Sequence, residues 1–228
     1  MPVGMTAATA LLAVGTAALL ALLLVRSHRH AAGLARELAY AHDEARRYRL
    51  LADLDGLTGL HNRRYFHELL AREVTRAQRY GRELALVIFD LDDFKGINDR
   101  IGHLGGDAVL AETAARARRA LRAADIACRV GGDEFAVLLP EASGAEAERL
   151  YRRLHRAVSS SPVAGAGNVS VSAGIAELQA DDEPNTFFER ADEALYRAKA
   201  YGKGQVIRAP RRNPTSDATR RPGTAGSP

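Results

Sequence analysis

The sequence has a single cysteine, Cys128, in 228 residues. One thiol excludes an intramolecular disulfide and any zinc site built from pairs of cysteines. Lysine is also scarce, since only three of the 32 basic side chains are lysines: Lys95, Lys199 and Lys203. Because the chain otherwise uses arginine, these three positions are candidates for sites where a compact point charge is preferred to a planar guanidinium.

A net positive charge is missing from the middle of the chain, although the formal net charge of the whole is +4. Residues 26–52 carry six arginines against three acidic residues, and residues 209–228 carry four arginines against one aspartate. These two segments together account for +6, which leaves residues 53–208 with a net charge of −2. A nucleic-acid-binding domain would carry basic charge on its folded part. The composition therefore argues against nucleic acid as a partner.

The first 25 residues contain no charged side chain. Residues 5–25 form an apolar run that, as a helix, reaches the thickness of a hydrocarbon core, about 30 Å. We expect residues 1–25 to be a transmembrane anchor; the alternative is a cleaved signal peptide, which would have a basic start and a shorter apolar core. Arg26 and Arg29 follow directly, so the positive-inside rule predicts a single-pass protein of the inner (cell) membrane with the remainder in the cytoplasm.

A heptad pattern follows over residues 26–52. Small and apolar residues recur with alternating spacings of four and three: Leu34, Leu38, Ala41, Ala45, Tyr48 and Ala52. This spacing is typical of a coiled-coil seam, and a membrane anchor would raise the local concentration of two such helices. We expect a coiled-coil-like signalling helix that forms a parallel dimeric stalk. The alternative is a single amphipathic helix packed on its own domain. At the other end, residues 209–228 have almost nothing to bury and predict a disordered tail.

Residues 53–208 alternate helical and strand patterns. We expect strands over 84–89, 126–130, 135–139, 169–176 and about 205–207, and helices over 104–122, 144–158 and 185–201. The element order αβαββαβαβ predicts an α/β domain of the α+β type, with helices packed on a mixed sheet.

Two acidic clusters lie at the ends of predicted strands. Asp90 follows the first strand, and Asp133 and Glu134 occupy the turn of a predicted hairpin. If Asp90 and Asp133 face each other on adjacent strands, they would suit a hard divalent cation, which usually shares its shell with substrate phosphates. A pair of such ions serves phosphoryl or nucleotidyl transfer. The alternative is that these acids only solvate loop ends. The three lysines, two of them one helical turn apart, would supply positive charge for phosphates.

The sequence resembles the GGDEF family of diguanylate cyclases in five ordered segments. Residues 131–135 (GGDEF) are the signature itself. Upstream, residues 55–64 (DGLTGLHNRR) and 89–107 (FDLDDFKGINDRIGHLGGD) resemble two family motifs; downstream, residues 171–176 (VSAGIA) and 191–199 (ADEALYRAK) resemble two more. The resemblance covers residues 53 to about 208.

The resemblance implies a fold similar to the palm of class III nucleotidyl cyclases, here preceded by a transmembrane helix and a helical stalk. It also implies that two GTP are joined into cyclic di-GMP with release of two pyrophosphates. Each subunit of a homodimer would hold one GTP, and the 3′-hydroxyl of one would attack the α-phosphate of the other. A dimeric stalk would bring the two half-sites face to face.

The resemblance further implies a role for individual residues. Asp90, the Leu91 carbonyl and Asp133 would bind Mg²⁺, with Mn²⁺ as an alternative and two ions per active site. Asp133 would assist deprotonation of the 3′-hydroxyl, and Glu134 would align metal or substrate.

Substrate binding is implied for a second set of residues. Asn98 and Asp107 would read guanine, and adenine lacks the donor pair that the aspartate needs, which disfavours an adenylyl-type cyclase. The phosphates would be bound by Lys95, Lys199 and Lys203 together with the backbone N–H groups of Asp93 and Phe94.

Arg122 and Asp125 stand at the family's product-inhibition motif, where cyclic di-GMP would bind as an inhibitor. The alternative is an ion pair at a helix end. Lys203-Gly204 replaces the more usual Arg-Asn, and His61 stands where proline is common. His103 is either a residue near the base pocket or a structural turn histidine. A different class of function also stays open, namely a catalytically silent module that binds GTP or cyclic di-GMP and relays it.

Overall fold

The computed structural model describes residues 52–211 continuously, together with separate residues between 11 and 44. Contacts divide the chain into two units, with the boundary between Ala52 and Asp53. In the first unit the described residues from Leu11 to Glu44 are helical. None of the helices among the described residues has both the length and the apolar character needed to cross a bilayer. Much of the predicted anchor, most of the predicted heptad and residues 212–228 of the predicted tail lie outside the described residues.

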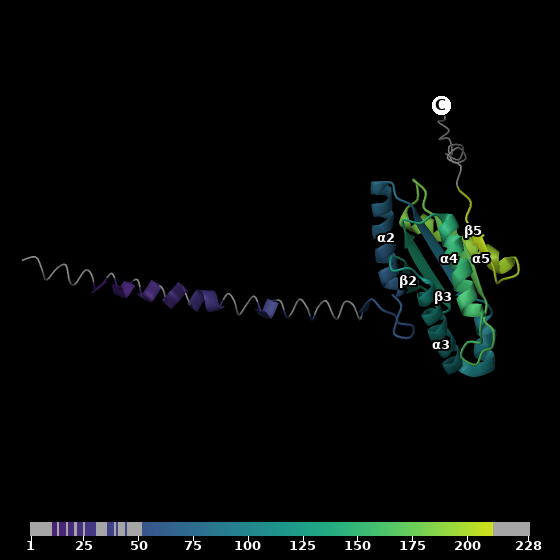
Figure 1. Ribbon diagram of the computed structural model, residues 1–228, viewed down its shortest axis with the longest axis horizontal. Helices are drawn as coiled ribbons and strands as arrows, with labels where there is room; N and C mark the ends of the chain where they lie inside the picture. The colour runs from purple at the N-terminus through teal and green to yellow at the C-terminus, as the bar shows by residue number, and fades with distance from the viewer. Residues whose placement is uncertain are drawn as a thin grey trace, which may run out of the picture. The chain divides into compact units, whose positions relative to one another are not determined.

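The second unit is a five-stranded sheet with helices on both faces (Figure 1). Its helices are α2 (Arg63–Tyr80), α3 (Phe94–Ala120), α4 (Gly144–Ser159) and α5 (Pro184–Ala200). Its strands are β1 (Leu84–Leu91), β2 (Ile126–Arg129), β3 (Glu134–Pro140), β4 (Val171–Glu177) and β5 (Val206–Arg208). The strand order is β2-β3-β1-β4-β5, in which β4 and β5 are parallel and the other pairs antiparallel. The predicted element order and mixed sheet are confirmed.

β1 is the central strand, and all eight of its residues are buried. Successive side chains of a strand point to opposite faces. Val87 and Phe89 therefore join the core beneath α3 and α4, whereas Leu86 and Ile88 join the core beneath α2 and α5. A strand that is covered on both faces exposes neither row of side chains to water. This is why residues 84–89 form one continuous apolar run.

Two predicted boundaries are wrong in ways that affect the site. β1 continues past Phe89, because Asp90 pairs with Glu134 on one side and Ser172 on the other. The helix predicted over 104–122 begins at Phe94 and ends at Ala120. Gly102, with φ 76° and ψ 166°, interrupts the helical conformation, and the polar, glycine-containing first part of α3 carries little helical periodicity of its own. The other boundaries shift by one or two residues.

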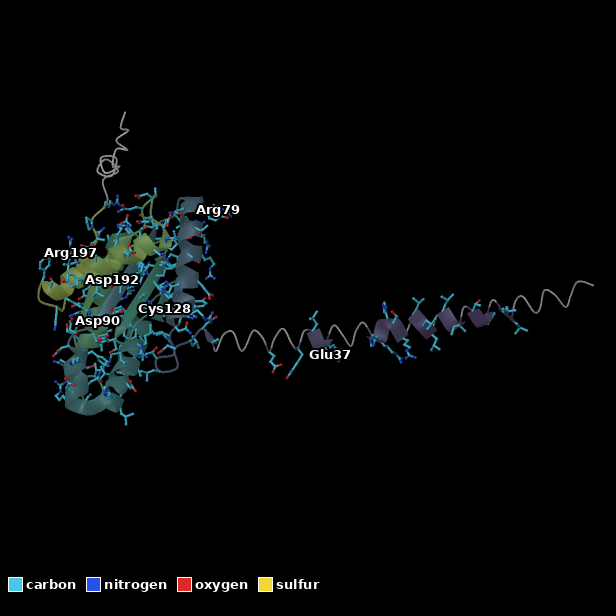
Figure 2. All side chains as sticks on the ribbon, turned by 180° about the vertical axis from the view of Figure 1, so that it is seen from behind. Glu37, Arg79, Asp90, Cys128, Asp192 and Arg197 are labelled. Carbon is cyan, nitrogen blue, oxygen red and sulfur yellow. The ribbon has the colours of Figure 1, made fainter. Side chains whose placement is uncertain are left out.

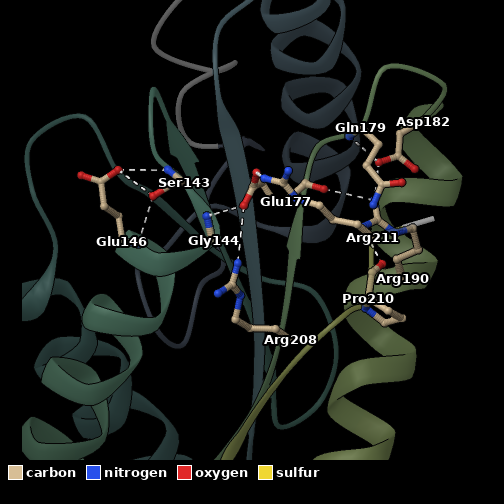
Figure 3. Close-up of polar contacts among 10 residues, drawn as sticks. All are labelled: Ser143, Gly144, Glu146, Glu177, Gln179, Asp182, Arg190, Arg208, Pro210 and Arg211. Atoms are coloured by element: carbon tan, nitrogen blue, oxygen red, sulfur yellow. Dashed lines mark hydrogen bonds and ion pairs between the residues drawn. The ribbon is translucent and has the colours of Figure 1, made fainter. Parts of the chain in front are cut away.

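Charged side chains fasten the end of the described chain to the sheet (Figure 3). Glu177, the last residue of β4, forms ion pairs with Arg208 at 3.6 Å and with Arg211 at 2.5 Å. Its carboxylate also accepts the backbone N–H of Gly144 at 2.9 Å, which ties the start of α4 to the same point. β5 is thus held by side-chain contacts as well as by its three residues of strand pairing.

Asp182 and Arg190 form a second charged contact beside the first (Figure 3). The Asp182 side chain is fully buried, and Arg190 is its ion-pair partner. Arg190 also donates to the carbonyl oxygens of Glu177 at 3.1 Å and Pro210 at 3.4 Å. A buried charge needs such a partner, because its desolvation would otherwise be strongly unfavourable.

Candidate active site

The pairing of β1 with β3 brings three acidic residues, Asp90, Asp133 and Glu134, to one end of the sheet. Asp90 lies opposite Glu134 in the strand register. The N–H of Leu91 donates to the carbonyl oxygen of Asp133 at 3.4 Å, so the turn that contains Asp133 adjoins the end of β1. Residues more than 40 positions apart in sequence therefore meet through the backbone ladder, but Asp90 faces Glu134 rather than Asp133, which lies in the turn beside Leu91.

The Asp90 carboxyl group, labelled in Figure 2, has a raised pKa. Asp90 is only 4% exposed. Burial raises its pKa to about 6; the charges of Asp133 and Glu134 act in the same direction, and a hydrogen bond from Lys199 opposes them. The Nζ of Lys199 lies 2.9 Å from Asp90 Oδ2, a contact that the sequence did not predict. Lys199 therefore supplies the positive charge that is paired with the Asp90 carboxylate.

The donor set fits a hard divalent cation. A buried carboxylate beside two others is in an environment that disfavours its charged form, and a cation would reverse that preference. Among the described residues, no three or more His, Cys, Asp or Glu side chains gather as a metal-binding group. A cation bound by Asp90 and Asp133 would therefore complete its shell with the Leu91 carbonyl and substrate oxygens, as magnesium commonly does.

The Arg129 side chain stabilises the turn over residues 131–133 by hydrogen bonds to its backbone. Its Nε and Nη2 donate to the carbonyl oxygen of Gly132 at 3.1 and 2.7 Å. Its Nη1 donates to the Asp55 carboxylate at 3.1 and 3.3 Å. Burial alone would raise the pKa of Asp55, but hydrogen bonds from Thr58 and Arg129 outweigh it and lower the pKa. The segment that opens the domain is thus joined to the turn that carries Asp133.

Neither Arg129 nor Asp55 was predicted as a site residue. Asp55 lies in a recognised motif, but its spacing gave no hint of its partner, which is 74 positions away. Arg129 is one of many arginines, so nothing in the composition distinguishes it. Its position two residues before the glycines was the available signal.

The residues expected to read guanine lie on either side of the break at Gly102. Asn98 is half-buried in the first part of α3, and Asp107 is exposed in the second. A Cβ on Gly106 would lie 1.8 Å from Asn98 Oδ1, so the amide side chain rests directly on the backbone next to Asp107. The structure therefore brings these two positions together. His103 is exposed beside the break.

The candidate phosphate ligands come from two helices. Asp93, with φ 57° and ψ 34°, precedes α3, and its side chain caps none of the N–H groups described for the first turn of this helix. The N–H groups of Asp93 and Phe94, at the start of this helix, suit an anion. Lys199 lies in the last turn of α5, and the exposed Lys203 follows in a loop.

Arg122 and Asp125 lie beside a separate cavity of about 500 Å³, which His61 and Arg118 also line. The Asp125 carboxylate accepts the backbone N–H of Arg122 at 2.8 Å. The Arg122 guanidinium lies 3.8 Å from Glu146, and no ion pair joins it to Asp125 within the described residues. The ion pair of the Arg122 side chain is therefore with Glu146, in the first turn of α4, and not with Asp125.

Comparison with known proteins gives consistent matches to one family. The family model described as "Diguanylate cyclase, GGDEF domain" matches residues 52–205. The chain is 42% identical over 170 residues to the diguanylate cyclase DgcP of Pseudomonas aeruginosa, which covers 73% of this chain and 25% of DgcP. It is 42% identical over 163 residues to the response regulator PleD of Caulobacter vibrioides, which covers 69% of this chain and 36% of PleD. The chain thus spans only 25–36% of the length of these curated relatives.

Solved structures agree with the sequence matches. The coiled coil and GGDEF domain of DgcB from Caulobacter crescentus, in complex with c-di-GMP, matches with a TM-score of 0.72 and 31% identity, over 80% of this chain and 98% of that one. The GGDEF domain of PA1120 (TpbB or YfiN) from Pseudomonas aeruginosa matches with a TM-score of 0.65 and 40% identity, over 69% and 94%. Because the family model covers more than half of the chain, the chain belongs to the GGDEF diguanylate cyclase family.

Proposed function

We propose that this protein is a diguanylate cyclase that condenses two GTP into cyclic di-GMP and releases two pyrophosphates. The observation that carries the proposal is that the pairing of β1 with β3 brings Asp90, Asp133 and Glu134 to one end of the sheet, where Lys199 forms an ion pair with Asp90. Intact acids at this position, in a chain of the GGDEF family, favour turnover over a silent binding module.

Asp90, the Leu91 carbonyl and Asp133 would hold two Mg²⁺ per active site, with Mn²⁺ as an alternative, and the bound ions would neutralise charge on the α-phosphate. The 3′-oxygen of one GTP bonds to the α-phosphorus of the other GTP. Asp133 accepts the proton that the 3′-hydroxyl loses. The bond from that phosphorus to pyrophosphate breaks, and pyrophosphate leaves with the electron pair. Glu134 aligns the reacting groups.

Substrate recognition is assigned to residues on either side of this centre. Asn98 and Asp107 bind the edge of guanine, where the aspartate accepts from the ring N–H and the exocyclic amine. The β- and γ-phosphates are neutralised by Lys95, Lys199 and Lys203, assisted by the backbone N–H groups of Asp93 and Phe94.

The proposed active form is a homodimer. Each chain binds one GTP, and the 3′-hydroxyl that attacks the GTP of one chain belongs to the GTP of its partner. The match that includes the coiled coil of DgcB supports a stalk over residues 26–52. The uncharged run in residues 1–25 supports a single-pass anchor in the inner membrane, with the catalytic domain, residues 53–208, in the cytoplasm and a disordered tail over residues 209–228.

Cyclic di-GMP is proposed as an inhibitor as well as the product. The cavity beside Arg122 and Asp125 supports a binding site there, since the Arg122 side chain is 60% exposed and its ion pair with Glu146, at 3.8 Å, is long enough for a phosphate to compete. The neighbouring structure of DgcB was solved with c-di-GMP. Arg122→Ala should raise the final yield of product.

The test is turnover of GTP by the full chain in detergent micelles with Mg²⁺, followed by mass spectrometry. We expect cyclic di-GMP from the wild type, a loss of at least about 100-fold in Asp133→Ala, and wild-type turnover in Glu189→Gln, which alters an exposed carboxylate of α5. GTP binding without product would establish the relay module instead. Normal turnover in Asp133→Ala would refute the assignment of this residue.

A further inference from the structure

Asp92 lies between the candidate metal ligands and α3, and its carboxylate is bound by two segments from elsewhere in the chain. Its Oδ1 accepts the hydroxyl of Ser172 at 2.6 Å. Its Oδ2 accepts the backbone N–H of Gly204 at 2.9 Å, across 112 positions of sequence. The Gly204 N–H is shared with Ser172 Oγ at 3.1 Å. The end of β1, the start of β4 and the loop after α5 therefore meet at one carboxylate.

The loop that Asp92 holds has an unusual backbone. Gly202, Lys203 and Gly204 have φ values of 118°, 63° and 59° in succession. Positive φ is unfavourable for a side chain such as that of Lys203, and such a residue persists only where its surroundings fix it. The N–H of Lys203 donates to the carbonyl oxygen of Ala198 at 3.2 Å, and the next N–H, that of Gly204, donates to Asp92.

Of these contacts, the one to Asp92 is the strongest, because a hydrogen bond to an ionised acceptor is worth roughly twice a neutral one. Ser172 is fully buried, so the far side of the contact is rigid. Glycine also suits position 204 because it adopts the φ of 59° found there at no steric cost.

We propose that Asp92 is a positioning residue that acts through Gly204 to fix the backbone of Lys203, and so directs its ammonium group to the phosphates of GTP. This inference rests on the proposed function, because it takes Lys203 as a phosphate ligand. It assigns no metal or substrate contact to Asp92 itself.

The test is a double-mutant cycle of Asp92→Asn and Lys203→Ala in the full chain. Asparagine keeps the size of the side chain but cannot accept from both Ser172 and Gly204. We expect each single variant to raise the KM for GTP by about tenfold with a smaller change in kcat, in line with the loss of one hydrogen bond to a charged group. The double variant should match Lys203→Ala alone.

Two results would overturn the inference. One is an unchanged KM in Asp92→Asn, and the other is a double variant whose KM rises by the product of the two single effects. Ser172→Ala provides a second route if Asp92→Asn does not fold: it removes one anchor of the carboxylate and should raise KM only while Lys203 is present. Glu189→Gln is the control of unchanged KM.

The same cycle separates this inference from the proposed function. GTP affinity is measured by calorimetry beside turnover. A wild type that binds GTP but makes no cyclic di-GMP would refute the proposed function, while coupled losses of affinity in the cycle would still support the role of Asp92. A wild type with turnover but without coupling would refute only the role of Asp92.

Discussion

Replacement of Arg129 by alanine should damage catalysis although the hydrogen bonds of this side chain go to Gly132 and Asp55 rather than to any of the three candidate metal ligands. Arg129 is only 15% exposed and joins the carbonyl oxygen of Gly132 to the carboxylate of Asp55. In Arg129→Ala the Gly132 carbonyl and the Asp55 carboxylate both lose this hydrogen-bond donor. The turn that contains Asp133 is then no longer tied to Asp55.

The size of the effect follows from these contacts. A hydrogen bond that involves a charged group contributes about 1.5–3 kcal/mol. If this free energy is lost entirely from the stabilisation of the transition state, kcat/KM should fall by about 10- to 150-fold. The loss of one half-buried partner should also cost about 2 kcal/mol of folding free energy, which is about 4–8 °C in Tm for a domain of this size. Arg129→Lys keeps the charge but cannot span both acceptors, so it should be intermediate.

The assay is the initial rate of cyclic di-GMP formation across GTP concentrations, with Tm measured on the same preparations. Arg79→Ala serves as the control, because Arg79 is exposed in the last turn of α2 (Figure 2). If Arg129→Ala kept kcat/KM within about twofold of the wild type while well folded, the turn would hold itself and the reasoning would be wrong.

Three further predictions concern two buried groups and one half-buried carboxylate. Asp182→Ala leaves Arg190 without its buried partner and should destabilise the domain by about 3–5 kcal/mol, seen as a large drop in Tm; a loss below about 1 kcal/mol would show that the pair is hydrated. Burial raises the pKa of the Cys128 thiol to about 12, so a thiol reagent at pH 8 should react only after denaturation, and rapid reaction of the native protein would contradict its burial in β2. Because hydrogen bonds lower the pKa of Asp55 in the folded state, its stabilisation is present above its ordinary pKa and is lost as pH falls through the folded value. Asp55→Asn should therefore lose less Tm than the wild type between about pH 5 and pH 3, and equal losses would exclude Asp55 from the acid transition.

The sequence predicted those parts of the fold that a local pattern controls. The strand from Leu84 was predictable because every residue in it is buried. The helix from Phe94 to Ile101 was missed, because its residues are chosen for contacts at the site rather than for one buried face. The stop at Gly102 could not be placed either, since glycine marks a break without specifying its angle.

The site was predictable only as a set of residue types. Acids at two strand ends and three rare lysines indicated the chemistry, and the resemblance to a family supplied individual roles. What could not be predicted were contacts that depend on the whole sheet. Examples are Lys199 with Asp90, Asp92 with Gly204, and Arg129 with Asp55, each formed across 70 or more positions.

The contrast between β1 and β5 has a consequence for how the protein fluctuates. β1 is paired along both edges, whereas β5 pairs through three residues with β4 alone. Local opening is least frequent where pairing and burial are greatest. Amide protons of β1 should therefore exchange with solvent only on global unfolding, and those of β5 through brief local opening. Asp90 thus belongs to the most persistent part of the domain, while Lys203 precedes its most readily opened strand. The pairing of β5 should therefore be able to open while Asp90 and Glu134 stay in register.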